Sequence, residues 1–152
     1  MRYEDVTENV YDILHNVVRE FFPGLVNAKI LCIFDLKKRM SKGNIVLARI
    51  KKSDDLIRHL TINNAGEEDG YDYIMFLDQM IWQSIEEVDK VRIVRHELRH
   101  CFITDEGNYS IIPHDIEDFA AEIELNSDDI RWSTRVAELC MHLYSQEREM
   151  TR

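Results

Sequence analysis

The segment that most constrains this chain reads His-Glu-Leu-Arg-His and occupies residues 96–100. Residues four apart on a helix lie one above the other, so His96 and His100 can share one tetrahedral Zn²⁺ ion. Glu97 projects beside that pair, where a carboxylate can take a proton from an activated water without being a ligand itself. The pattern also occurs by accident on charged helices, so the neighbouring sequence has to decide between the two interpretations.

The sequence around the motif predicts a helix over residues 86–103. Val91, Val94 and Leu98 recur at three- and four-residue steps, with charged residues elsewhere. Neither proline nor glycine interrupts the segment. A helix of this length would present both histidines from one face, which favours a metal site over an accidental match.

A catalytic zinc site needs a third protein ligand and keeps its fourth position for water. His114 follows a short loop in which Gly107 and Asn108 predict a turn, and it lies where a proline and an aspartate predict a new helix. A histidine at that corner can reach back toward the first helix, although alone it would be an exposed loop residue. Together with the upstream motif, these features make His114 the predicted third ligand.

The motif, the short loop and the sequence His-Asp-Ile-Glu-Asp-Phe at residues 114–119 together resemble the phage metallopeptidases, small proteins related to SprT-like zincins. The stretch from Tyr71 to Phe76, followed by Trp82, is also similar, so the resemblance extends over residues 71–123. Arg99 stands inside the motif, where many relatives carry a smaller or apolar residue. The cysteine-rich or basic tail of the DNA-directed relatives is missing, which argues against a role in DNA repair.

The resemblance implies a minimal zincin that hydrolyses peptide bonds in an unidentified protein, with Zn²⁺ held by the three histidines. Glu97 would accept the proton of the attacking water and deliver it to the leaving amine. Tyr109, in the loop between the ligands, and Arg99 are candidates for stabilising the tetrahedral oxyanion.

The acidic residues after the loop leave two alternatives open. Other zincins take their third ligand from a carboxylate on the following helix, so Glu117 or Asp118 could replace His114. Zinc-binding histidines also donate their second N–H to carboxylates, and Glu117 and Asp118 fit that role as well as a place in the first turn of a helix. For Asp115 and Glu122 we expect only the helical role.

A non-catalytic zinc protein that binds a phage or host partner is the alternative function. Glu97 counts against it, because a purely structural site has no need of that carboxylate. A third possibility, without any metal, would leave His96 and His100 as residues on a helix surface.

Composition narrows the class of protein further. The 152 residues predict a single domain, and 45% hydrophobic residues suffice for a buried core. The net charge of -10 argues against nucleic-acid binding, which depends on lysine and arginine at phosphates. No apolar run approaches the roughly 20 residues that span a bilayer, and the acidic N-terminus is unlike a signal peptide. With three separate cysteines expected as buried thiols, we predict a cytoplasmic protein, in the host cytoplasm if a phage encodes it.

The remaining pattern predicts an α+β domain, in which a small, mostly antiparallel sheet packs on an N-terminal helix, the motif helix and C-terminal helices. The resemblance implies that the strand from Tyr71 to Leu77 lies at the edge of the cleft, where it could pair with an extended substrate peptide. The expected helices are 3–22, 86–103, 115–125 and one after a cap at 127–129; the expected strands are 27–36, 45–50 and 71–77; residues 53–62 form a helix or a weak strand.

Overall fold

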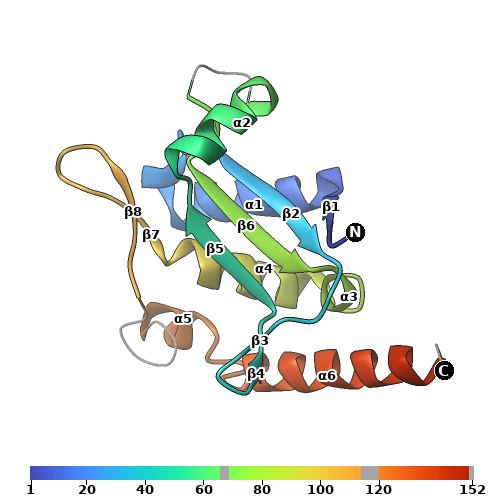
Figure 1. Cartoon of the computed structure of the whole chain (residues 1–152). Coiled ribbons are helices and arrows are strands. Elements are labelled where there is room, and N and C mark those ends of the chain that lie inside the picture. Colours follow the sequence, from blue (N-terminus) through green and yellow to red (C-terminus); the bar gives the residue numbers. More distant parts are fainter. Residues whose placement is uncertain (66–68, 114–119, 151–152) are drawn as a thin grey trace.

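A four-stranded sheet forms the centre of the fold in the computed structural model, which describes residues 1–65, 69–113 and 120–150 (Figure 1). Its strand order is β1-β2-β6-β5. β2 and β6 run parallel, whereas β1 and β5 each pair antiparallel with their neighbour, so the sheet is mixed. The strands are β1 (Tyr3–Asp5), β2 (Ile30–Asp35), β5 (Ala48–Lys52) and β6 (Tyr73–Asp78).

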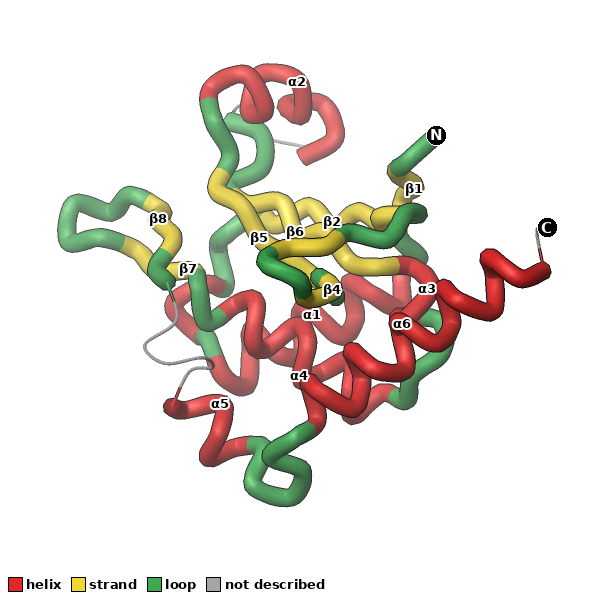
Figure 2. The backbone as a smooth tube through the Cα atoms, turned by 60° about the horizontal axis from the view of Figure 1, so that its bottom comes forward, coloured by secondary structure: helices red, strands yellow, loops and turns green. Residues whose placement is uncertain are grey.

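Helices cover one face of this sheet. The two that pack against it are α1 (Glu8–Phe21) and α4 (Glu87–Leu98), which lie behind the strands in Figure 1 and below them in Figure 2. The fold is therefore α+β, as the sequence predicts. The other elements are η1 (Pro23–Leu25), α2 (Asp55–Ala65), α3 (Gln79–Trp82), α5 (Ala120–Leu125), α6 (Trp132–Met150) and two hairpins, β3 (Met40–Ser41) with β4 (Asn44–Ile45) and β7 (Cys101–Ile103) with β8 (Tyr109–Ile111).

The hydrophobic core lies between the sheet and the helices. Val10, Ile13 and Val17 recur along one side of α1 at the spacing of an amphipathic helix, and all three are buried. They belong to the same core cluster as Met75 on β6 and Val94 on α4. Burial of these side chains seats the motif helix directly under the sheet, which fixes where its histidines lie.

The N-terminal residues differ from the prediction of a helix beginning at Tyr3. They form β1, in which Tyr3 pairs with Asp35 and Asp5 with Ile33. The main-chain groups of β2 would otherwise face solvent along this edge, and pairing satisfies them. The helix begins only at Glu8, and Pro23 follows soon after its last residue, as expected.

The prediction of a cleft-edge strand from Tyr71 to Leu77 is wrong. β6 lies second from the edge, because Tyr73 pairs with Ile30 on one side and with Lys52 on the other. Its apolar run is typical of an interior strand buried on both faces. β5 is the outer strand, and among the described residues no further strand pairs with its outer edge.

The motif helix is shorter than predicted. α4 ends at Leu98, and His100 lies just beyond it in a turn, where its N–H bonds to the Glu97 carbonyl at 3.1 Å. The chain then forms the β7–β8 hairpin, whose turn contains Gly107 at a φ of 84°, in the region that favours glycine. Because residues 101–103 pair with β8, their main-chain N–H and C=O groups form sheet hydrogen bonds in place of the helical ones that the prediction implied.

Residues 53–62, for which the sequence predicts a helix or a weak strand, are helical from Asp55 onward. Residues 53–62 contain the start of α2, since the Asp54 carboxylate accepts a hydrogen bond from the N–H of Ile57 at 2.8 Å. The expected strand 45–50 is divided between β4 and β5.

His114, Glu117 and Asp118 lie outside the described residues. All three cysteines are buried free thiols, and no described helix is both long and apolar enough to cross a membrane.

Candidate active site

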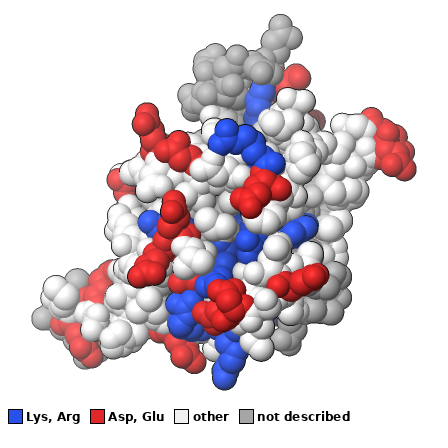
Figure 3. Space-filling model, turned by 180° about the vertical axis from the view of Figure 1, so that it is seen from behind, with Lys and Arg blue, Asp and Glu red and all other residues white. Residues whose placement is uncertain are grey.

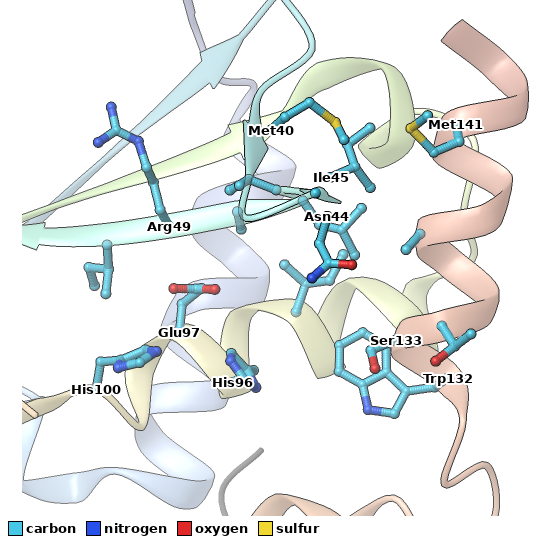
Figure 4. A pocket seen from close by; sticks show the side chains of 18 of the residues that line it. Met40, Asn44, Ile45, Arg49, His96, Glu97, His100, Trp132, Ser133 and Met141 are labelled. Carbon is cyan, nitrogen blue, oxygen red and sulfur yellow. The ribbon is translucent and has the colours of Figure 1, made fainter. Parts of the chain in front are cut away.

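His96, Glu97 and His100 line one cavity of about 1160 Å³. Its floor is the C-terminal end of α4, and its walls are the β3–β4 hairpin and β5 on one side and α6 on the other (Figure 4). The structure thus brings the three residues of the motif that carry chemistry to one opening. The four-residue spacing achieves this although His100 lies past the end of the helix.

The two histidine rings lie close together at this opening. Their centroids are 5.6 Å apart and their planes are inclined by 73°. Nδ1 of His100 lies 2.7 Å from the carbonyl oxygen of Ile112. A carbonyl only accepts, so Nδ1 carries the proton, and in the neutral ring Nε2 carries the lone pair. This arrangement, with one ring nitrogen anchored on a carbonyl, is typical of metal-binding histidines.

Glu97 is buried although it carries an ionisable carboxyl. Its side chain is 8% exposed, and in Figure 4 it lies between the two histidines and extends toward β5. Burial raises the pKa of this carboxyl to about 8. A carboxyl with such a pKa can take up and return a proton near neutral pH, which suits a general base. A cation bound beside it would lower the pKa again.

Arg99 and Tyr109, the two candidates for an oxyanion donor, do not line this cavity. Arg99 turns to the other side of the helix, where its Nε donates to Glu122 at 2.8 Å and its guanidinium lies over the ring of Phe22. Tyr109 packs edge-on against Tyr73, with ring centroids 5.6 Å apart. Both residues therefore act in packing in this structure.

The predicted third ligand, His114, lies outside the described residues, as do its alternatives Glu117 and Asp118. Pro113, the residue directly before His114 in the sequence, is described and lines the cavity. Among residues 1–65, 69–113 and 120–150, no three metal-ligating side chains lie together. Of the predicted metal ligands, the structure therefore describes only His96 and His100.

Sequence reasoning missed a buried network behind the motif. Glu122 is fully buried and accepts hydrogen bonds from Nε of Arg95 at 2.7 Å and from Nε of Arg99 at 2.8 Å. Arg95 also donates to the side chain of Asn126 at 2.6 Å. The four-residue spacing of the two arginines was a usable signal, since it places both on one face of the motif helix. We expected Glu122 only in a helical first turn, and it also holds α5 against α4.

Sequence reasoning also missed the apolar part of the cavity lining. Met40 and Ile45 come from the β3–β4 hairpin, whereas Trp132 and Met141 come from α6. These segments are far apart in the sequence, and no local pattern connects them.

Comparison with known proteins places the chain in a family. A family model described as "Putative phage metallopeptidase" matches residues 1–144. No curated protein and no solved structure matches the chain at a significant level. Because the family match runs from the first strand through most of α6 and includes the whole motif, the chain belongs to the phage metallopeptidase family.

Proposed function

We propose that this protein is a zinc-dependent peptidase in which His96, His100 and His114 hold the ion and Glu97 is the general base. Membership in the family implies a metal ion and protein substrates. The observation that carries the proposal is the convergence of two imidazoles and a buried carboxyl in one cavity. Within the described ranges Glu97 forms no ion pair, and a buried acid of this kind is costly to the fold, which favours a functional role for it.

The donor set fits zinc. Imidazole nitrogens are common zinc ligands, and a ring fixed through its second nitrogen, as His100 is through Ile112, is held in place for binding. The cavity is large enough to leave room for water and substrate beside the histidines. His114 follows the cavity-lining Pro113 directly in the sequence, which supports it as the closing ligand.

The role of Glu97 follows from its position. When bound, Zn²⁺ would supply a Lewis acid that polarises the scissile carbonyl. Glu97 takes one proton from the water that attacks this carbonyl carbon, and a C–O bond forms. The same carboxyl then gives that proton to the amide nitrogen as the C–N bond breaks, which leaves a carboxylic acid and an amine.

β5 is the element that we assign to binding the substrate backbone. It replaces the strand from Tyr71 to Leu77 in that role, since β6 has neighbours on both sides. Ala48 and Ile50 on β5, and Leu47 just before it, line the same cavity as Glu97. An extended peptide could add to the outer edge of β5 through main-chain hydrogen bonds, which would present its carbonyls to the site.

Hydrolysis of an unstructured protein tests this function. Zinc-loaded protein should cleave casein, and Glu97→Gln should abolish cleavage while it keeps both the metal and the melting temperature in chelator-free buffer. The matched control is Glu124→Gln, an exposed glutamate on α5, which should cleave normally. Stoichiometric zinc without cleavage of any protein substrate would instead favour the non-catalytic zinc-binding alternative.

A further inference from the structure

The cavity has an apolar end beyond the histidines. Met40 and Ile45 from the β3–β4 hairpin face Met141 from α6 across this end, with Asn44 between them and the motif (Figure 4). Met40 is 45% exposed and Met141 is 39% exposed. Large apolar side chains gathered in a hollow, and not scattered singly over the surface, are characteristic of binding sites.

This apolar end is continuous with the reactive part of the cavity. The same opening contains His96 and Glu97, and its lining continues without a break from Gly43 in the β3–β4 hairpin to Ile50 on β5. A peptide extended along β5 would therefore place a side chain at the apolar end while another part of its backbone lies at Glu97. Continuity of this kind assigns the apolar end to the substrate and not to an unrelated ligand.

The chemistry of the lining indicates which side chain fits. Methionine is flexible and polarisable, so Met40 and Met141 can adapt to apolar groups of different shapes. Glu138, which is exposed on α6, also lines the cavity and would repel an acidic group. Arg49 extends away from the two methionines in Figure 4 and so leaves the apolar character of this end intact.

We propose that the apolar end is a specificity subsite that takes a large apolar side chain of the substrate, such as leucine, methionine or phenylalanine, close to the scissile bond. The proposal rests on the proposed peptidase function. Met141 and Met40 are its specificity-determining residues, because they face each other from opposite walls. Burying one leucine-sized side chain contributes enough to discriminate against a charged residue by about tenfold or more.

Binding measured without cleavage tests the subsite. The probes are two short fluorescein-labelled Ala/Ser peptides, one with a single central Leu and one with Asp in its place. Zinc-loaded Glu97→Gln protein should bind the Leu peptide at least about tenfold more tightly by fluorescence anisotropy. Adding Met141→Lys should bring the ratio close to one. Met150→Lys is the matched control, since Met150 is 86% exposed near the end of the same helix and should leave the ratio unchanged.

The outcomes separate the subsite from the hydrolytic function. Equal binding of the two peptides, no binding of either at millimolar protein, or a ratio insensitive to Met141→Lys overturns the subsite. Casein cleavage by wild-type protein without enrichment of Leu, Met or Phe near the cut sites overturns it as well, while the peptidase function stands. A Met141-dependent preference for the Leu peptide without any cleavage supports the subsite and counts against the hydrolytic function alone.

Discussion

The carboxylate of Glu122 accepts a hydrogen bond from Nε of Arg95 at 2.7 Å, and both residues are buried. Arg99 donates to the second oxygen of the same carboxylate at 2.8 Å, so one acid on α5 contacts both the last turn of the motif helix and the residue that caps it. Removing one member of a buried ion pair leaves the other charge in a medium of low dielectric constant. The network therefore fixes α5 against the back of the helix that carries the histidines.

Loss of Glu122 should destabilise the protein strongly. Glu122→Ala leaves Arg95 buried without its carboxylate, and we expect the free energy of unfolding to fall by about 3–5 kcal/mol. Urea unfolding at neutral pH measures this change. Glu124→Ala, on the exposed side of the same helix, should stay within about 0.5 kcal/mol of wild type. Equal effects of the two substitutions would contradict a special role for the buried network.

Periodicity and turn signals predicted much of the fold. The apolar repeat of α1 and the apolar runs of β2 and β6 lie in single segments, so a local pattern was enough to find them. The order of the strands was not accessible in this way. β6 lies between β2 and β5 because of pairings that span more than twenty residues, and a local pattern carries no information about them.

The candidate site shows the same division. The sequence predicts that His96, Glu97 and His100 lie close together, because helical spacing over five residues is enough to bring their side chains near one another. Arg99 was predicted as a possible oxyanion donor, but its direction depends on Glu122, which is more than twenty residues away. Local sequence also could not show that the β3–β4 hairpin and α6 would face each other over the cavity.

A second buried charge on the motif helix gives stability a defined pH dependence. Asp89 accepts hydrogen bonds from Arg92 and Arg135, both at 2.8 Å. Figure 3 shows that basic and acidic side chains alternate over the face that carries the helices. Burial alone would raise the pKa of Asp89, but the hydrogen bonds from the two arginines outweigh it and lower the pKa. The folded state thus binds the proton of Asp89 less readily than the unfolded state does.

This lowered pKa fixes the direction of the effect. The stabilisation is fully present above the unfolded pKa of about 3.9 and is lost as pH falls through the lower folded value. At pH 7, Asp89→Asn should reduce the free energy of unfolding by about 1.5–3 kcal/mol, toward the lower figure because Arg135 is half exposed. As the pH falls into the acid range, the free energies of unfolding of wild type and Asp89→Asn should converge. Urea unfolding across pH checks this, and Asp12→Asn, at an exposed position on α1, should show no such trend.

Zinc should stabilise the folded protein through the motif histidines. A ligand that binds only the native state raises its stability by mass action, so chelation should lower the melting temperature of zinc-loaded wild type. His100→Ala should abolish tight binding and this thermal shift. His142→Ala, at an exposed position on α6, should bind one equivalent and melt like wild type. Equal zinc binding by the two variants, measured by elemental analysis after dialysis, would contradict the assignment of His100.

The identity of the third ligand is the sharpest test of the site. Two histidines alone would form an open and weak site, so we predict that a residue after the β7–β8 hairpin closes it. His114→Ala should therefore weaken zinc binding severely, whereas Glu117→Ala and Asp118→Ala should each cost roughly 10–100-fold at most, as the loss of a group that only orients a ligand does. Competition against a chromogenic chelator measures all three affinities under one condition. If Glu117→Ala or Asp118→Ala instead loses the metal as completely as His100→Ala, while His114→Ala retains it, a carboxylate is the third ligand and His114 is not.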